Sequence, residues 1–429
     1  MYKRQVNISL TYNSEIEIIN LSNNKIIISE GSNALRSELL NSFDYQIDNY
    51  AKLKYIDTNY YILDNHKKLY FEDSVLNKII SSNTMFNSQS NITLYSIDEN
   101  LKIVSYNETT TNVRTYLFLN ISANSSLKIH NPTNPNTYAF GSTIVSDYET
   151  YWQIIGNNTN EIILNKFDST SFIASYTHSV SYLVSSTNII MDDDYVIYSL
   201  FINATNQLKL LKFDLNKSNF TTENINSTFT QADSIIQGYH LNRSIAIICD
   251  STTNKIHLQY STINETHFGS NMGIFNNTYL TFTNLSSITY IENNNDKHGK
   301  FYFIVNETNG VFHLFTINNL FNRLIKLYSF NAHASFQIPS CVIAGQYLYI
   351  SYNNSPYNII IPNLIKYDLS SGEYYVRYNA FKLKTGVSSG IYNKCYLNDH
   401  GGHVCGINLQ VDRSAITSYD FYYNIGKII

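Results

Sequence analysis

Two short patterns recur in fixed phase along most of the chain, and together they constrain the fold more than any other feature. The first is a polar turn between two apolar runs, with its clearest copies at Asn157, Asn203, Asp250 and Asn306. The second is a Lys-aromatic-Asp triplet, or a variant of it, which follows the turn at 166–168, 212–214, 259–261, 366–368 and 418–420. The pair of patterns repeats roughly every 46 to 56 residues, and the chain is therefore predicted to consist of similar units of about this length. This length is close to that of a four-stranded propeller blade and exceeds that of the common helical repeats.

The stretch 149–177 shows what one unit contains. An apolar run ends at Gly156, a turn rich in Asn follows, and a second apolar run begins at Ile162. Two β-branched and aromatic runs joined by a short Gly/Asn turn are typical of a β-hairpin. A third run, 171–176, extends the hairpin to a meander. Many runs are apolar at nearly every position, which indicates strands that are covered on both faces.

Antiparallel units of this length predict an all-β chain that forms a single β-propeller of four-stranded blades over residues 1–429. The expected units are 50–82, 83–130, 138–178, 180–230, 231–280, 284–331 and 336–380, with a further group of strands in 386–429. Residues 31–49 are the least strand-like, and we interpret them as an inserted loop or a short helix. Helix is expected to be scarce elsewhere, since β-branched and aromatic residues dominate.

The number of blades depends on how the ring closes. We expect strands from both termini to share one blade, because this removes the exposed edge of an open sheet. Eight blades is the favoured number on this basis. Seven blades, with part of the N-terminus outside the ring, is the alternative, and nine stays open because the first 30 residues can hold more than one closing strand.

Composition and charge restrict the classes of partner. Hydrophobic residues make up 43% of the chain, enough for a large core, whereas charged residues make up only 14%. A net charge of −4 argues against a nucleic-acid partner held by phosphate contacts. No run approaches the ~20 apolar residues of a membrane span, so membrane insertion is not expected. The segment 1–6 lacks the apolar region of a signal peptide, and we expect either a removed leader or another export route.

The units resemble the blades of β-propeller proteins such as the kelch-like and quinoprotein-like families. The likeness covers most of the chain and is carried by the Lys-aromatic-Asp triplet followed by a polar turn. The chain departs from these families in detail: it has no Gly-Gly pair in each blade, no Trp-Asp dipeptide and no sialidase-type Asp box. The resemblance therefore implies the fold and no functional residue.

One cluster near the C-terminus has the residue types of a metal site. Cys395, His400, His403 and Cys405 offer the nitrogen and sulfur ligands that zinc prefers, although their spacing matches no common zinc module. The favoured interpretation is a disulfide between Cys395 and Cys405 across a hairpin, provided that the protein is extracellular. Cys249 and Cys341 lie within apolar runs and are expected to be buried free thiols.

Other candidate sites have simpler explanations. The carboxylates of 192–194 are hard oxygen ligands of the kind that calcium binds, but a turn that enters a strand explains them better. The loop 293–299 is expected to be a hairpin tip, with His298 in solvent. The hydrolase elbow, zincin and nucleotide-loop motifs are absent from the sequence, and we expect no cofactor.

Asn-x-Ser/Thr sequons recur through the chain, and several coincide with the polar turns. These are Asn107, Asn157, Asn203, Asn306 and Asn353. A hairpin turn on an exposed rim is a place where a glycan can be attached. The alternative is that Asn and Thr are simply good turn formers in an AT-rich coding background.

The sequence favours a non-enzymatic interaction protein over an enzyme. The expected role is an adhesin, a virion or appendage component, or a cell-surface binding platform that recognises a glycan or a protein through propeller loops. Its expected location is extracellular, on a cell surface or on a virion surface, as part of a larger assembly. The alternative is a secreted propeller enzyme that acts on carbohydrate at the central channel, because two carboxylates brought together by the fold suffice for that chemistry.

Overall fold

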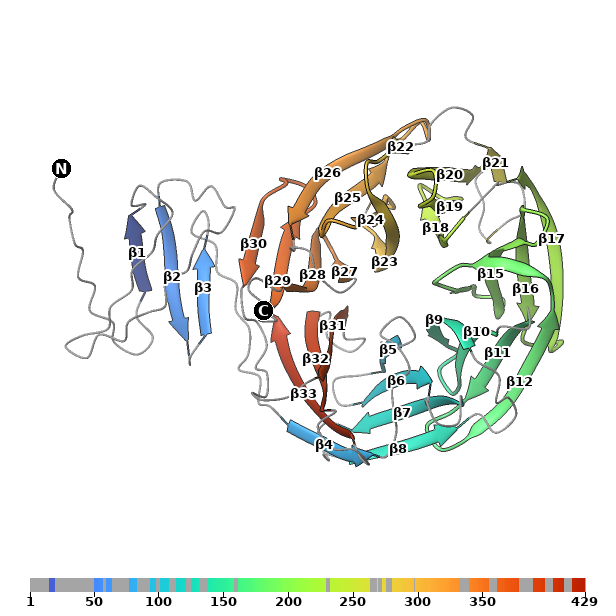
Figure 1. The fold of residues 1–429 in the computed structure, drawn as a ribbon, viewed down its shortest axis with the longest axis horizontal. Helices are drawn as coiled ribbons and strands as arrows, with labels where there is room; N and C mark the ends of the chain where they lie inside the picture. The colour runs from blue at the N-terminus through green and yellow to red at the C-terminus, as the bar shows by residue number, and fades with distance from the viewer. Residues whose placement is uncertain are drawn as a thin grey trace.

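The chain folds as a ring of antiparallel sheets in a computed structural model (Figure 1). The structure describes residues 15–19, 50–56, 59–63, 77–82, 93–97, 101–107, 113–120, 125–130, 138–157, 161–228, 232–262, 268, 272–274, 280–296, 298–331, 339–354, 361–377, 389–397, 404–412 and 419–428. Within these residues there are strands and turns and no helix, as the composition predicted. The expected insertion at 31–49 lies outside them.

In six of the seven blades the strands follow one another in the chain, and blades 5 and 6 are joined into one sheet of eight strands by the parallel pairing of their innermost strands. Blade 1 contains β5 (Thr93–Ser96), β6 (Leu101–Asn107), β7 (Arg114–Asn120) and β8 (Ser125–His130). Blade 2 contains β9 (Tyr138–Ser146), β10 (Tyr151–Asn157), β11 (Glu161–Phe167) and β12 (Phe172–Ser179). Blade 3 contains β13 (Tyr182–Ser185), β14 (Ile190–Met191), β15 (Val196–Asn203), β16 (Gln207–Asp214) and β17 (Asn219–Thr228).

The remaining blades complete the ring. Blade 4 contains β18 (Ser234–His240), β19 (Arg243–Asp250), β20 (Lys255–Ser261), β21 (Met272–Ile274) and β22 (Leu280–Thr281). Blade 5 contains β23 (Leu285–Asn295), β24 (Phe301–Glu307), β25 (Val311–Ile317) and β26 (Leu324–Asn331). Blade 6 contains β27 (Ser340–Ala344), β28 (Tyr347–Asn354), β29 (Ile361–Asp368) and β30 (Tyr374–Arg377). Blade 7 contains β31 (Ser389–Leu397), β32 (Val404–Asp412), β33 (Tyr419–Ile428) and β4 (Asn77–Ser82).

Strands from both ends of the chain close the ring, as predicted. The antiparallel register of β33 and β4 pairs Tyr419 with Ser82, so an N-terminal strand completes the blade that the C-terminus builds. The described residues form seven blades, the alternative count, and the favoured count of eight is wrong. The unit expected at 50–82 does not form a blade, because its last strand supplies the fourth strand that blade 7 lacks.

The first three strands pair with one another instead. A three-stranded sheet contains β1 (Glu15–Ile19), β2 (Tyr50–Ile56) and β3 (Asn59–Leu63). Figure 1 shows this sheet outside the ring, on the side of β30. The hydrophobic pattern predicts strands here, but as parts of a blade or as closing strands of the ring, because it carries no information on which edge a strand completes.

The core lies between blades, and this explains why the strands are apolar at nearly every position. In β19, Ile247 packs with residues of blade 5, whereas the next residue, Ile248, packs with residues of blade 3. Side chains of a strand alternate between its two faces, so a blade enclosed by two neighbours needs apolar residues on both. Separate clusters of buried apolar side chains likewise lie between blades 1 and 2, between blades 2 and 3, and between blades 5 and 6.

Each of the three residues of the Lys-aromatic-Asp triplet makes a contact that stabilises the blade. In blade 2, Phe167 is fully buried, and the ammonium of Lys166 lies 4.7 Å from the centre of the Trp152 ring. Asp168 Oδ1 accepts hydrogen bonds from the amides of Thr170 (2.7 Å) and Ser171 (2.7 Å), which fixes the turn to the outer strand. The triplets of blades 3 and 6 repeat all three contacts with Tyr198 and Tyr347 as the rings under lysine. In these blades the triplet therefore marks the hairpin between the third and fourth strands. The copy at 418–420 does not, because Tyr419 and Asp420 begin β33, the third strand of blade 7.

Candidate functional site

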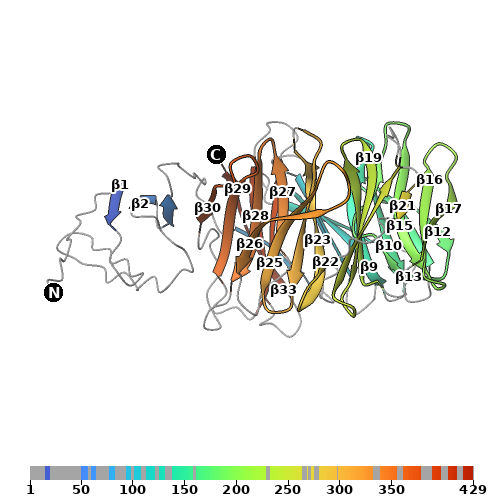
Figure 2. The ribbon, with the colours of Figure 1, turned by 90° about the horizontal axis from the view of Figure 1, so that it is seen from above.

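The fold sorts the turns that the structure describes onto two opposite rims of the ring (Figure 2). The innermost strands of neighbouring blades run parallel where they meet, at Ser186 and Ile235 and again at Ile291 and Cys341. Corresponding turns of successive blades therefore lie on the same rim. One rim, here named the tyrosine rim after Tyr148 and Tyr195, has the turns between first and second strands and between third and fourth strands. The other, the sequon rim, has the turns between second and third strands.

Tyr148 and Tyr195 occupy equivalent turns in the adjacent blades 2 and 3. Their exposed fractions are 94% and 44%, although tyrosine is a residue that folding usually buries in part. Both have a left-handed backbone, with φ of 76° and 60°. A bulky residue in this region is strained, and such strain persists only where surrounding contacts hold it in place.

A carboxylate holds each of these turns. Asp147 accepts hydrogen bonds from the Thr150 amide (2.8 Å) and from the indole Nε1 of Trp152 (3.0 Å). Burial opposes ionisation of Asp147, but the bonds from Trp152 and Thr150 outweigh it and hold the pKa of this carboxyl below its usual range. The turn of blade 2 is therefore clamped to the buried Trp152, and Tyr148 projects from a fixed base.

Asp192 has the same role in blade 3. Its Oδ1 accepts from the Val196 amide (2.8 Å) and its Oδ2 from the Tyr198 hydroxyl (2.6 Å). Burial, and then this hydrogen bond, raise the pKa of Tyr198. The turn interpretation of 192–194 is thus confirmed. Among the described residues, no group of His, Cys, Asp and Glu is arranged to hold a metal ion.

Blade 5 repeats the clamp with Asp296, whose Oδ2 accepts from the Tyr302 hydroxyl at 2.9 Å. Its Oδ1 accepts from the amides of His298 and Lys300, at 2.8 and 3.0 Å. The predicted hairpin tip is confirmed here, and His298 is exposed as expected. On the same rim Leu320 is 75% exposed.

The strands that line the centre of the ring are nearly uncharged. In the innermost strands described for blades 1 to 6, Glu292 of β23 is the one charged residue. Their polar side chains bind neighbouring backbone: Gln237 Nε2 donates to the Tyr198 carbonyl (2.8 Å), and its Oε1 accepts from the Leu200 amide (2.9 Å). Asn188 in turn exchanges two hydrogen bonds with the Gln237 backbone. These amides join blades 3 and 4.

A second buried network joins blades 1 and 2. Gln153 Oε1 accepts from Ser105 Oγ (2.8 Å) and from Arg114 Nε (3.3 Å), and its Nε2 donates to the Ser142 carbonyl (2.8 Å). A Cβ on Gly141 would overlap the Arg114 guanidinium, so only glycine leaves room for this side chain. The arrangement is suited to holding blades together.

The cysteines differ in what the structure shows of them. Cys249 and Cys341 are buried free thiols, as predicted, and burial raises the pKa of the Cys249 thiol to about 12. Cys395 and Cys405 lie on the paired strands β31 and β32, where their register partners are Gly406 and Tyr396 respectively. The two cysteines are thus offset by one position, which places them on opposite faces of the strand pair. A disulfide between them requires the register to shift by one residue, and it stays a prediction. His400 and His403 lie outside the described residues.

All five sequons singled out in the sequence lie at the ends of second strands, on the sequon rim. Asn203 is at an exposed turn, where its Oδ1 accepts from the amides of Thr205 and Gln207. Asn306 is only 1% exposed, and its Nδ2 donates to Thr289 Oγ1 at 2.8 Å. The interpretation of Asn306 as a glycan site is therefore corrected, because a buried amide leaves no room for a sugar. Asn107, Asn157 and Asn353 stay predictions.

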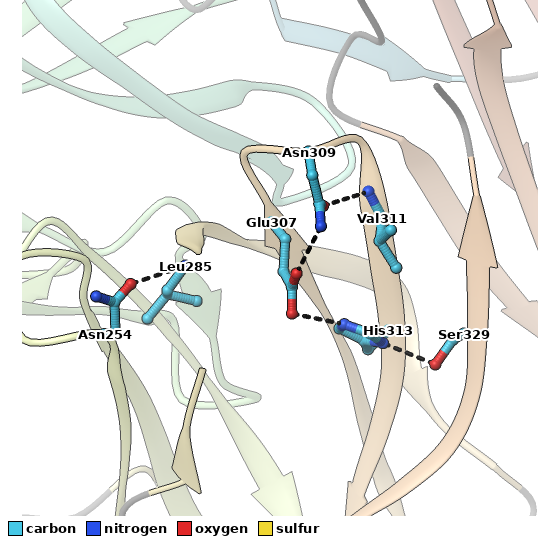
Figure 3. A network of polar contacts seen from close by, with 7 residues as sticks. All are labelled: Asn254, Leu285, Glu307, Asn309, Val311, His313 and Ser329. Carbon is cyan, nitrogen blue, oxygen red and sulfur yellow. Dashed lines mark hydrogen bonds and ion pairs between the residues drawn. The ribbon is translucent and has the colours of Figure 1, made fainter. Parts of the chain in front are cut away.

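The sequon rim of blade 5 also contains a group of polar side chains that the sequence did not reveal (Figure 3). Glu307 is the last residue of β24, His313 lies in β25 and Ser329 lies in β26. Hydrogen bonds join His313 to the other two residues. Beside them Asn254 of the blade 4 turn accepts from the Leu285 amide at 2.9 Å, which fixes the entry into blade 5. The group therefore lies on a rigid seam between blades 4 and 5.

Comparisons with known proteins identify neither a family nor a function for the chain. No protein-family model matches the chain, and no curated protein matches it. Among solved structures, the WD40 repeats of RRP9 are 9% identical with a TM-score of 0.47, and cover 82% of this chain and 97% of their own. Polysaccharide lyase Uly1 is 9% identical (TM-score 0.45, 80% and 90% covered). The periplasmic gluconolactonase PpgL of Pseudomonas aeruginosa is 6% identical (TM-score 0.46, 78% and 93% covered).

These similarities concern shape alone, and the propeller fold is established by the order and register of the sheets. No helix among the described residues is long and apolar enough to cross a membrane.

Sequence reasoning missed both the exposed tyrosine turns and the group of Glu307, His313 and Ser329. The tyrosine turns had a usable signal, since Asp147, Asp192 and Asp296 each precede their aromatic partner by five or six residues. The Glu307, His313 and Ser329 group had none. Glu307 and His313 meet across the hairpin of β24 and β25, and Ser329 joins them only because of the register of β25 and β26.

Proposed function

We propose that this propeller is a binding platform on an extracellular, cell or virion surface, where it acts as an adhesin or appendage component. The observation that carries the proposal is the pair of exposed, clamped tyrosines, Tyr148 and Tyr195, in adjacent turns of one rim. A tyrosine offers a large amphipathic contact with few rotatable bonds, so little conformational entropy is lost on binding. The Asp147 and Asp192 clamps reduce this loss further by holding the turns before a ligand arrives.

The ligand class that suits this rim is a protein or a glycan. Aromatic rings beside turns that can form hydrogen bonds are able to contact either kind of ligand. Tyrosine is also enriched among the residues that contribute most to the binding energy of interfaces. If the glycans predicted at Asn107, Asn157, Asn203 and Asn353 are present, they occupy the opposite rim. The alternative of a carbohydrate-active enzyme has less support, because the innermost strands described for blades 1 to 6 supply one carboxylate, Glu292, whereas glycoside hydrolysis uses two.

The test is a glycan array together with a pull-down from host-surface extracts, using the full chain and the double variant Tyr148→Ala, Tyr195→Ala. Leu183→Ala is the matched control, because Leu183 is 55% exposed but lies at the start of β13 on the sequon rim, next to Tyr182, the register partner of Asn203. The double variant is expected to lose roughly tenfold or more in affinity, whereas the control retains it. Equal binding by both variants would refute the role of the rim. Turnover of a polysaccharide that Glu292→Gln abolishes would favour the enzyme instead.

A further inference from the structure

Three side chains from neighbouring strands of blade 5 form a line of hydrogen bonds (Figure 3). Ser329 Oγ lies 2.8 Å from His313 Nδ1, and His313 Nε2 lies 3.1 Å from Glu307 Oε1. Ser329 and His313 are register partners across β25 and β26, so the backbone hydrogen bonds of the sheet hold them in place. A nucleophile, a base and a group that orients the base are the parts of an activated nucleophile.

The hydrogen bonds determine which nitrogen of His313 carries the proton. An ionised carboxylate only accepts hydrogen bonds, so the neutral imidazole donates from Nε2 to Glu307. The lone pair of Nδ1 is then free to accept the proton of the Ser329 hydroxyl. This is the tautomer that a general base needs in order to act on Ser329.

The orienting carboxylate is itself held. Asn309 Nδ2 donates to Glu307 Oε2 at 3.0 Å, and Asn309 Oδ1 accepts from the Val311 amide, also at 3.0 Å. The turn between β24 and β25 therefore fixes both oxygens of Glu307. The carboxylate cannot rotate away from the imidazole without breaking the bond to Asn309.

The surroundings shield the base and expose the nucleophile. His313 is 8% exposed and packs against the rings of Phe282 and Phe315, with centroids at 6.0 and 6.3 Å. Ser329, in contrast, is exposed on the outer strand β26. Shielding strengthens the electrostatic contact between Glu307 and the imidazole, while the hydroxyl stays within reach of a reagent in solution.

We propose that Ser329 is an activated hydroxyl that accepts an acyl group from an activated ester or thioester. Ser329 Oγ forms a bond to the acyl carbon as its proton passes to His313 Nδ1, and the bond from that carbon to the alkoxide or thiolate breaks. The proton leaves with this group or passes to water, so charge and atoms balance. Glu307 stabilises the imidazolium through Nε2. The site lies on the opposite rim from Tyr148 and does not depend on the proposed binding function.

The test uses p-nitrophenyl acetate and the full chain. Release of p-nitrophenolate is followed by absorbance, and peptide mass spectrometry locates the acetyl group. Acetylation is expected at Ser329, with at most slow labelling of Ser169, an exposed turn serine that serves as the internal control. Ser329→Ala removes the labelled peptide.

Glu307→Gln separates activation from folding. The glutamine keeps the shape of the side chain, but its amide donates to Nε2 and moves the imidazole proton to Nδ1. The acetylation rate of Ser329 is then expected to fall by roughly 10² or more, with the thermal midpoint little changed. Nitrogen-15 NMR of the imidazole gives an independent measure, since it reports an Nε2 proton in the parent protein and an Nδ1 proton in the variant. Acetylation of Ser329 no faster than Ser169, an unchanged rate in Glu307→Gln, or an Nδ1 proton in the parent would each overturn the proposal.

Discussion

The side chain of Gln237 offers a sharp test of how neighbouring blades are joined. The innermost strand of blade 3 is interrupted between β13 and β14, and this leaves two backbone groups of β15 without a partner in their own sheet. Gln237 of blade 4 supplies both missing hydrogen bonds, to the Tyr198 carbonyl and from the Leu200 amide. All three residues are buried, so water does not compete for these bonds.

Gln237→Met keeps the length of the side chain and removes both bonds. A buried backbone group left without a partner costs about 1–3 kcal/mol, so two such groups cost roughly 2–6 kcal/mol. The more apolar Met side chain offsets about 1 kcal/mol of this by its own burial, and the expected loss of stability is about 1–5 kcal/mol.

The assay is equilibrium unfolding in urea, followed by the fluorescence of Trp152, the one tryptophan in the chain, and by circular dichroism. Gln207→Met is the control, because Gln207 is exposed and its one side-chain contact, with Asn203, is long at 3.5 Å. Its effect is expected to stay within about 0.5 kcal/mol. Equal midpoints for the two variants would refute the view that Gln237 joins blades 3 and 4.

Three further outcomes follow from buried or paired groups. Burial, and then the charge of Lys300, lower the pKa of His240 from 6.5 to about 4, and its Nδ1 accepts from the Phe301 amide at 3.0 Å. The folded state therefore binds fewer protons than the unfolded state, and the stability from neutral His240 is present above pH 6.5 and lost as the pH falls toward 4. Urea midpoints between these values are expected to depend less on pH in His240→Gln. Cys249 is expected to resist iodoacetamide at pH 8 until the protein unfolds, because its thiol is buried and its pKa is raised to about 12; labelling of the folded protein would contradict this. Cys395 and Cys405 are expected to form a disulfide in the exported protein only if the register of β31 and β32 shifts by one residue; the cross-link then stabilises the protein by about 2–3 kcal/mol, and non-reducing peptide mapping that finds both thiols free would rule it out.

The repeat itself made the architecture predictable. Lys166, Phe167 and Asp168 make local contacts within one blade, so the same three residue types recur wherever the same hairpin is built. Unit boundaries such as 138–178 and 284–331 agree with blades 2 and 5 to within a residue at each end. Local hydrogen bonding and burial on both faces are properties that a sequence pattern records directly.

The number of blades was not determined in this way. The strand Asn77–Ser82 has the same β pattern whether it completes a blade of its own or the blade of the C-terminus. Its partner β33 lies more than 300 residues away in the chain. The choice depends on which sheet edge lacks a strand once the ring has formed, and only the assembled ring defines that edge.

The predicted features fall into two classes, those that depend on residues close together in the chain and those that depend on the assembled sheets. The sequence by itself determined an all-β ring, its blade hairpins, the buried thiols Cys249 and Cys341, and the turn at 192–194, because each depends on residues close together in the chain. The tertiary structure alone decided that Tyr148 and Tyr195 share one rim, and that Ser329 meets His313. Both results depend on strand direction and register across the sheet, where one residue of slip moves a side chain to the opposite face.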